Sequence, residues 1–367
     1  MAVNFAQWGN DLYTGRRSYD IVGRRRVWFT ISAVLVLLSA VFLVKPGLQP
    51  GIEFRGGSEF TVSNAATSDQ QPAMDAVAEV APEEVPRVTN VGSSSIRIQT
   101  TELTNDQVDQ VRTALEEAYG VTEDDVASSF IGPTWGKDVS QKAAISLVVF
   151  LVLVALVLTV YFRNWRMAVA AIIALFHDLI VTVGVYAAVG WEVTPATVIG
   201  FLTILAYSIY DTVVVFDKVR ENTTGVLDQT RATYAERANL AVNQTLVRSI
   251  NTSVVALLPV AGILFIGAFV LGAGTLRDIA LALFVGMIVG AFSSVFLATP
   301  LEVALRVREQ PIREHTAKVL AARARAAGAT EAPGTEGAPV AVARATGQVR
   351  PGGHQGPAAQ PRRKGRR

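Results

Sequence analysis

Six segments of this chain are apolar over lengths that match the thickness of a lipid bilayer. A bilayer core of roughly 30 Å needs about 20 apolar residues in a helix. The segments cover residues 27–44, 143–162, about 167–189, about 193–216, about 245–271 and about 279–300. The sequence therefore predicts a polytopic α-helical membrane protein with six transmembrane helices.

The composition supports this prediction and excludes several other classes of protein. Half of the residues are apolar, 17% are charged and the mean hydropathy is +0.35, which leaves too little polar surface for a soluble protein. The chain has no cysteine, and its three histidines, at 177, 315 and 354, are far apart. We therefore expect no disulfide, no metal site and no cofactor. Since no nucleophile–base pair and no nucleotide-binding loop are visible, we predict that the protein is not an enzyme and that its energy comes from an ion gradient or from a partner.

The positive charges of the short loops predict the orientation in the membrane. Lys and Arg gather on the cytoplasmic side of membrane proteins, and the loop at 190–194 has none. The positive residues are Arg16, Arg17, Arg24, Arg25, Arg26, Arg163, Arg166, Lys218, Arg220, Arg231 and Arg237. They all fall on one side if both termini are cytoplasmic, so we expect a multi-pass protein of the cytoplasmic membrane. The predicted parts are a cytoplasmic segment at 1–26, the first helix at 27–45, an outside domain at 46–141, helices two to six at 142–305 with a cytoplasmic loop at 217–244, and a tail at 306–367.

The outside domain has the pattern of a small α+β fold. Strands are predicted in GSEFTV, in 85–91, in 94–100 and in 125–131, and helices over 71–80 and 104–119. The second helix has Thr104 as its expected N-cap, Gln107 in the capping-box position, and an apolar face at Val108, Val111, Leu115 and Tyr119. The order β-α-β-β-α-β predicts a ferredoxin-like domain.

The outside domain and the tail carry opposite charges. Residues 46–141 hold 16 Asp and Glu against 5 Lys and Arg, a net charge of −11. We interpret this either as an acidic solvated surface or as a docking surface for polypeptide outside the membrane. Residues 306–367 hold 13 Lys and Arg against 4 Asp and Glu, a net charge of +9, and lack aromatic residues from about 319 onward. They are predicted to be a largely disordered tail that anionic lipid attracts, with no specific nucleic-acid partner.

Four ionisable residues lie inside predicted spans, where a charge costs on the order of 2.5–3.5 kcal/mol. Asp211 is buried towards the cytoplasmic half of the fourth span, and Arg248 reaches a similar depth at the start of the fifth. They are expected either to carry protons, with Arg248 tuning the pKa of Asp211, or to form a static salt bridge. His177 and Asp178 lie near the middle of the third span, where a proton relay and a packing role are both open.

Several motifs together resemble one known family. GIEFRGG (51–57) follows the first span and contains Gly51, Glu53, Gly56 and Gly57, with the glycine pair suited to a tight turn. The others are AIIALFHDLIVT, LAYSIYDTVVVFDKVREN (205–222, with Asp217), NQTLVRSINTS (243–253) and the closing segment 274–301. In order and spacing they are similar to the SecF protein-export family, over about residues 15–305.

The resemblance implies a fold, partners and an activity. SecF belongs to the resistance-nodulation-division superfamily and supplies six of twelve helices, while its paralogue SecD supplies the others. The family is expected to act with the SecYEG channel, SecA and YajC-like accessory proteins, and to use the proton-motive force to complete polypeptide export. The resemblance assigns proton passage to Asp211 and Arg248, and matches Asp178 to the family's His-Asp pair. Glu53 stands where the family commonly has Asp, and Tyr210 where it often has Asn or Gly.

Two other functions stay open from the sequence. The chain could be half of an exporter of lipids or small molecules, although six spans with one small outside domain lack the bulk of an efflux docking domain. It could also be a scaffold of the channel complex that conducts no protons.

Overall fold

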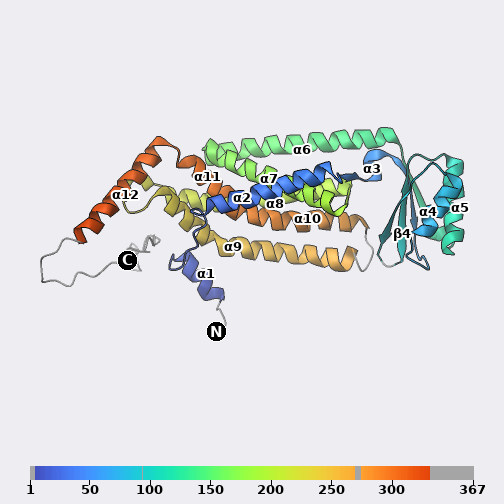
Figure 1. Ribbon diagram of the computed structural model, residues 1–367, viewed down its shortest axis with the longest axis horizontal. Helices are drawn as coiled ribbons and strands as arrows, with labels where there is room; N and C mark the ends of the chain where they lie inside the picture. The colour runs from blue at the N-terminus through green and yellow to red at the C-terminus, as the bar shows by residue number, and fades with distance from the viewer. Residues whose placement is uncertain (1–4, 93, 269–273, 331–367) are drawn as a thin grey trace, which may run out of the picture. The chain divides into compact units, whose positions relative to one another are not determined.

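The computed structural model describes residues 5–92, 94–268 and 274–330 of the 367-residue chain (Figure 1). The chain divides into two compact units. One contains residues 26–213 and 249–298, and the other contains 1–25, 214–248 and 299–367. Each unit is described by itself below.

Six helices in the described part of the chain are long and apolar enough to cross a membrane, which confirms the predicted number of spans. The last two spans each consist of more than one helical element, because short π-helical turns interrupt the α-helix. The elements are α2 (Arg25–Val44), α6 (Pro133–Phe162), α7 (Trp165–Val189), α8 (Pro195–Thr223), α9 (Tyr234–Gly262) with η3 (Ile263–Ala268), and α10 (Gly274–Ser293) with η4 (Ser294–Ala298) and α11 (Thr299–Arg306).

Burial separates central helices from peripheral ones. About half of the apolar window is buried within the chain for α7, α8 and the span that starts with α10 (56%, 44% and 50%). The corresponding share is 11% for α2 and 6% for both α6 and α9. Polar side chains on α7, α8 and α10 can therefore be shielded from lipid by protein, whereas α2, α6 and α9 present wide apolar faces to their surroundings.

The outside domain confirms the predicted order of strands and helices. Its four-stranded antiparallel sheet has the order β3-β4-β2-β5, with the two central strands paired from Ser58↔Thr100 to Val62↔Ile96. This is the arrangement of a ferredoxin-like split unit. The elements are β2 (Gly57–Val62), α4 (Gln71–Val80), β3 (Arg87–Val91), β4 (Ser95–Thr100), α5 (Asn105–Tyr119), η1 (Glu123–Asp125) and β5 (Val126–Ile131).

The core of this domain lies between the sheet and its two helices. Alternate residues of β2 and β4 point into it, and Phe60, Val62, Ile96 and Ile98 are fully buried. The same core receives the predicted apolar face of α5, with Val108 partly buried at its edge. The predicted capping box is confirmed by two hydrogen bonds. The backbone N–H of Gln107 donates to Thr104 Oγ1, and the backbone N–H of Thr104 donates to Gln107 Oε1.

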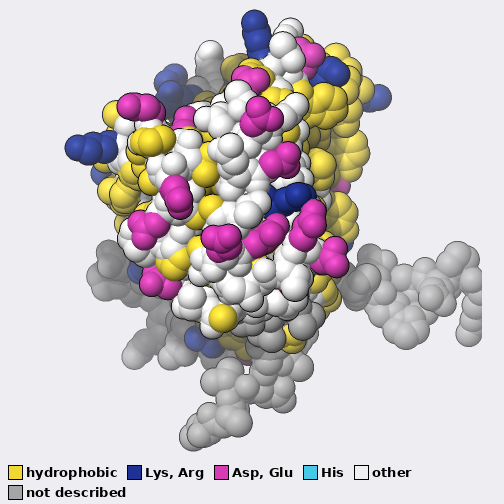
Figure 2. Space-filling view, turned by 90° about the vertical axis from the view of Figure 1, so that its right-hand side faces the viewer, with side chains coloured by type: hydrophobic (Ala, Val, Ile, Leu, Met, Phe, Trp, Pro, Cys, Tyr) yellow, Lys and Arg dark blue, Asp and Glu magenta, His cyan; other side chains and the backbone are white. Residues whose placement is uncertain are grey.

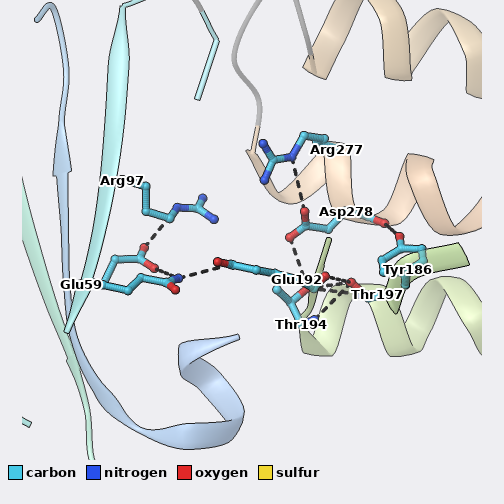
Figure 3. A network of polar contacts seen from close by, with 9 residues as sticks. Glu59, Arg97, Tyr186, Glu192, Thr194, Thr197, Arg277 and Asp278 are labelled. Atoms are coloured by element: carbon cyan, nitrogen blue, oxygen red, sulfur yellow. Dashed lines mark hydrogen bonds and ion pairs between the residues drawn. The ribbon is translucent and has the colours of Figure 1, made fainter. Parts of the chain in front are cut away.

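Both domain helices cover the face of the sheet that points away from the spanning helices (Figure 1). Figure 2 views the domain from that end and shows Asp and Glu side chains spread over it, with few Lys or Arg among them. The other face of the sheet carries the polar residues Glu59 and Arg97, which lie towards the ends of the spans (Figure 3). Gln99 is on this face as well, since it donates to Glu192.

A short parallel strand pair joins the domain to a loop between two spans. β1 (Gln49–Pro50) follows α2 and pairs with β6 (Glu192–Val193), which lies between α7 and α8. α3 (Ile52–Arg55) then leads into β2. Since α6 begins at Pro133, it starts inside the range predicted for the domain and directly after β5.

The second unit contains more helix than the sequence predicted. α1 (Phe5–Tyr13) lies in the segment at 1–26, and much of the range 217–244 belongs to the ends of α8 and α9, with η2 (Val226–Asp228) between them. The expectation of disorder is wrong for residues 310–330, which form α12 (Gln310–Thr330). Ile312 and Val319 are buried on one face of this helix, and Arg323 is held 2.7 Å from Glu236. The remaining predicted tail, 331–367, lies outside the described residues.

Candidate functional site: buried carboxylates in the spans and a polar joint outside them

Asp178 of α7 lies in a cluster of polar side chains inside the central helices. Its side chain is 97% buried, and its Oδ2 accepts hydrogen bonds from Ser208 Oγ of α8 at 2.5 Å and from Ser293 Oγ of α10 at 2.7 Å. His177 Nδ1 lies 3.1 Å from Asp178 Oδ1. We call these four residues the Asp178 cluster. A carboxylate removed from water needs such donors, and three helices supply them here.

The position of the Asp178 cluster along α7 follows from residue numbers. Asp178 is the fourteenth residue of α7, so it lies roughly 20 Å along the helix axis from Trp165. This places Asp178 near the middle of the 25-residue helix, and its depth in a membrane stays a prediction of the sequence. The contact of His177 with the carboxylate of the next residue is compatible with both roles that the sequence left open, a proton relay and packing.

A chain of hydroxyl groups continues from this cluster. Ser294, the first residue of η4, accepts a hydrogen bond from Thr212 Oγ1 at 3.1 Å and lies 3.5 Å from the Ser208 carbonyl oxygen. Where α10 ends and the π-helical turn η4 begins, Ser293 contacts α7 at Asp178 and Ser294 contacts α8 at Thr212. π-Helical turns of this kind recur at functional sites.

Asp211 is buried one residue before Thr212 in α8. Its side chain is in the unit of residues 26–213, and Ser249 Oγ of α9 donates to its Oδ1 at 2.9 Å. Arg248 is an exposed residue of α9 and belongs to the other unit. The ion pair between Asp211 and Arg248 therefore stays a prediction of the sequence. Asp217 lies two turns further along α8, half-buried in that other unit.

Sequence reasoning missed the serine partners of both carboxylates. Ser208, Ser249 and Ser293 are small and common in helices, so none of them stands out in an apolar run. The feature of the sequence that could have indicated these partners is the spacing of the serines. Ser208 precedes Asp211 by one helical turn, and Ser293-Ser294 is a pair of hydroxyls inside the last span.

The Gly-Gly motif forms a tight joint between the domain and α6. Gly56 has φ +79° and ψ 166°, and Gly57 has φ +135°, which are conformations that essentially only glycine adopts. A Cβ on Gly56 would lie 2.9 Å from Pro133 Cα, and one on Gly57 would lie 2.2 Å from the Thr100 carbonyl oxygen. The turn predicted here is confirmed, and close approach of two chain segments adds a second reason for glycine.

Gly51 and Glu53 belong to the same joint. Gly51 N donates to the Val193 carbonyl oxygen at 2.8 Å, which extends the pairing of β1 with β6. Glu53 is half-buried, and burial raises the pKa of its carboxyl above the usual range, with Glu59 and Glu192 adding to the rise. This side chain therefore takes up a proton more readily than an exposed glutamate.

A network of polar contacts connects the bare face of the sheet to the ends of the spans (Figure 3). Arg87 of β3 lies 3.2 Å from Glu192 Oε1 and donates to the Gly190 carbonyl oxygen at 3.1 Å and to Gln49 Oε1 at 2.9 Å. Gln99 of β4 donates to Glu59 and to Glu192, at 2.9 and 3.3 Å. The contacts of Arg87 with Gly190 and Glu192, and of Gln99 with Glu192, link the domain to the loop between α7 and α8.

The network continues into the spanning helices themselves. Thr194 Oγ1 donates to Asp278 Oδ2 at 3.3 Å, and Arg277 lies 3.6 Å from the other oxygen of the same carboxylate (Figure 3). Tyr186 of α7 donates to the Asp278 carbonyl oxygen at 3.0 Å. A displacement of the domain would thus act on α7, α8 and α10 together.

No group of three or more His, Cys, Asp or Glu residues in the described ranges has the geometry of a metal site. Among the buried carboxylates of the described spans, Asp178 and Asp211 are each hydrogen-bonded to serine. A carboxylate in such surroundings can hold a negative charge or a proton, and a change between these two states alters which hydroxyls it binds.

Two family models match the chain in the regions described above. The model for "Protein export membrane protein SecD/SecF, C-terminal" matches residues 110–308, and the "SecD/SecF GG Motif" model matches residues 41–63. Protein translocase subunit SecF of Streptomyces coelicolor is 48% identical over 87% of this chain and 85% of its own length. The chain belongs to the SecF family. SecF of Mycobacterium tuberculosis is 47% identical over 85% of this chain and 72% of its own length.

Solved structures of SecDF share the fold of this SecF chain. The crystal structure of SecDF from Thermus thermophilus has a TM-score of 0.70 and 30% identity, over 80% of this chain and 39% of that one. SecDF in its Super-membrane-facing form has a TM-score of 0.57 and 29% identity, over 86% and 40%. This chain thus spans about two fifths of the SecDF chain, so SecDF contains a large part that has no counterpart here.

Proposed function

We propose that this chain is an auxiliary subunit of the Sec protein translocase that couples proton movement to the export of polypeptide. Family membership supports the translocase role, and relatives named SecDF, in which a SecF-like part is joined to further chain, support a SecD-type partner. The proton-motive force is then the energy source, and no cofactor is needed. We place the protein in the cytoplasmic membrane with both termini inside, following the loop charges.

The observation that carries the proton-coupling proposal is the pair of buried carboxylates. Asp178 and Asp211 are both buried inside apolar helices, with hydroxyl groups as partners. Charges at such depth are costly to keep and usually serve ion passage. In this proposal Asp211 takes up and releases the coupled proton, Arg248 is its partner on the path as the family resemblance implies, and Asp178 with His177 serves a second position.

The partners follow from the same proposal. SecD would cover apolar faces of the peripheral helices, and the complex would act with SecYEG, SecA and YajC-like proteins. The translocating polypeptide would meet the acidic outside domain, whose distal surface is shown in Figure 2. The basic tail would lie near anionic lipid.

The test is proton-driven completion of export in inverted vesicles that contain this chain with its SecD partner. Asp211→Asn keeps the shape of the side chain and removes its charge. We expect this variant to assemble normally. The rate of its proton-dependent step of export should fall at least about tenfold, which corresponds to about 1.4 kcal/mol in activation free energy. Glu221→Gln is the matched control, because it removes an exposed carboxylate from the same helix. Unchanged proton dependence in Asp211→Asn would instead favour a scaffold that conducts no protons.

A second outcome separates export of polypeptide from export of small molecules. Co-purification with a SecD-type protein and SecYEG supports the translocase role. An active half-exporter would instead show proton-driven release of lipid or small molecules from vesicles that lack the channel.

A further inference from the structure

Three buried polar atoms near the Asp178 cluster have no hydrogen-bond partner among the described residues. They are His177 Nε2 of α7, Ser32 Oγ of α2 and Trp28 Nε1 of α2. His177 is 97% buried and Ser32 is 95% buried. A buried polar group without a partner costs about 1–3 kcal/mol, so such groups usually bind water.

Ser32 and His177 lie at one level of the helices, and Trp28 lies about one turn before Ser32 on α2. Ser39 of α2 touches α7 at Gly184, where an added Cβ would lie 2.3 Å from Ser39 Cβ. Both helices run towards the outside domain, and two turns back from this contact lead to Ser32 on α2 and to His177 on α7. We call the region lined by Trp28, Ser32 and His177 the α2–α7 seam.

Two aromatic rings of the last span lie close to the residues that line the seam. The Phe292 ring lies 6.3 Å from the Trp28 ring and 6.4 Å from the His177 ring, measured between centroids. Phe296, one turn further along this span, lies 4.3 Å from Trp28. Phe292 is followed directly by Ser293, which binds Asp178. The seam is therefore adjacent to the carboxylate, on the side that Ser208 and Ser293 do not occupy.

We infer that water enters the α2–α7 seam and that His177 passes protons between this water and Asp178. With a proton on Nδ1, His177 donates to Asp178 Oδ1 and presents Nε2 as an acceptor to the seam. A hydronium ion there gives its proton to Nε2 and becomes water, and the Nδ1 proton moves to Asp178 Oδ1. The ring keeps its charge and changes tautomer, and Asp178 becomes neutral while Ser208 and Ser293 remain on its other oxygen.

This assignment gives α2 a role beyond anchoring the domain. The proton-carrying part rests on the proposed function, whereas the presence of water in the seam does not. Of the four spanning helices that touch this site, α2 is the one that is mostly exposed along its length, so a small separation of α2 from α7 would open or close the seam.

The natural absence of cysteine allows a direct test for water. Ser32→Cys is a small change, and its thiol reacts with a water-soluble methanethiosulfonate only where water permits the thiolate to form. Ser39→Cys is the matched control on the same face of α2, equally buried but pressed against Gly184. Both variants are made in the full chain, assembled with its SecD partner in membrane vesicles. Full labelling after denaturation confirms that each thiol is intact.

We expect Ser32→Cys to react at least about tenfold faster than Ser39→Cys. Equal and slow reaction of both thiols would overturn the hydrated seam. If Ser32→Cys fails to assemble, exchange of the Trp28 indole proton with deuterated water in the native chain takes its place, and protection as strong as that of core amides would overturn the proposal.

His177→Gln tests the relay separately from the water. Gln can still donate to Asp178 but cannot pass a proton across a ring. We expect proton-driven export to fall about tenfold while Ser32→Cys in the same background stays reactive. Full proton-driven export by His177→Gln would overturn the relay. If Asp211→Asn leaves proton dependence unchanged, the proposed function fails while the labelling result for the seam still stands.

Discussion

Replacement of Gly57 by alanine should destabilise the outside domain by about 3 kcal/mol. The conformation at φ +135° is closed to residues with a side chain, and its strain costs about 2 kcal/mol. The new Cβ would lie 2.2 Å from the Thr100 carbonyl oxygen of β4. That oxygen belongs to the backbone of the central strand pair, so moving it weakens the ladder by about one hydrogen bond, or about 1 kcal/mol.

Gly120→Ala is the matched control in the same domain. Gly120 caps α5 at φ +61°, and no atom lies within 4 Å of the position that a Cβ would take. The control therefore suffers the left-handed strain alone, about 1 kcal/mol. The difference between the two variants isolates the clash with Thr100 and the more extreme backbone angle.

Hydrogen exchange of the full chain in lipid nanodiscs measures both effects. Because about 1.4 kcal/mol changes an equilibrium constant tenfold, the amides of β2 and β4 should lose about 100-fold protection in Gly57→Ala and about 5-fold in Gly120→Ala. Equal losses in the two variants would refute the reasoning, since the contact with Thr100 would then add nothing.

Three further changes test other parts of the domain and its joint. Thr104→Ala removes the capping box of α5 and should cost about 1 kcal/mol, seen as roughly 5-fold faster exchange in the first turn of that helix. Arg87→Ala leaves the buried Glu192 without its cation and should destabilise this contact by about 3 kcal/mol, measured as faster amide exchange at 190–194. Adding Glu192→Gln to the same chain should restore most of the lost stability, because the unpaired charge is then removed. Because burial raises the pKa of Glu53, its contribution to stability is present below the ordinary pKa of 4.5 and is lost as the pH rises through the raised value. Amide hydrogen exchange in residues 52–62 should therefore slow as the pH falls, and Glu53→Gln should weaken this pH dependence. An equal pH dependence in the native chain and the variant would contradict the role of Glu53.

The parts of the fold that could be predicted are those with strong local signals. The six spans follow from apolar length, and the order of strands and helices in the domain follows from alternation and helical spacing. Thr104 and Gln107 are an example at the level of single residues, because a capping box depends only on neighbours in sequence.

The parts that could not be predicted depend on contacts between distant segments. The serines that bind Asp178 come from helices about 30 and 115 residues away, and nothing local marks them as partners. The joint at Arg87 and Glu192 brings together a strand of the domain and a loop between spans, neither of which has a pattern that indicates the other. α12 was missed because its buried face consists of few residues, such as Ile312 and Val319, in an Ala- and Arg-rich stretch.

The strand pair of β1 with β6 has a consequence for the order of assembly during synthesis. Every strand of the four-stranded sheet lies between residues 57 and 131, so the sheet can pair as soon as that stretch has crossed the membrane. The partner of β1 comes only with residues 192–193, after two more helices have been made. At about 5–20 residues per second this is a delay of several seconds. During that time the folded domain is connected to α2 and α6 without its contact to β6. The late pairing of Gln49 with Glu192 marks the moment when the second and third spanning helices, α6 and α7, have taken their places.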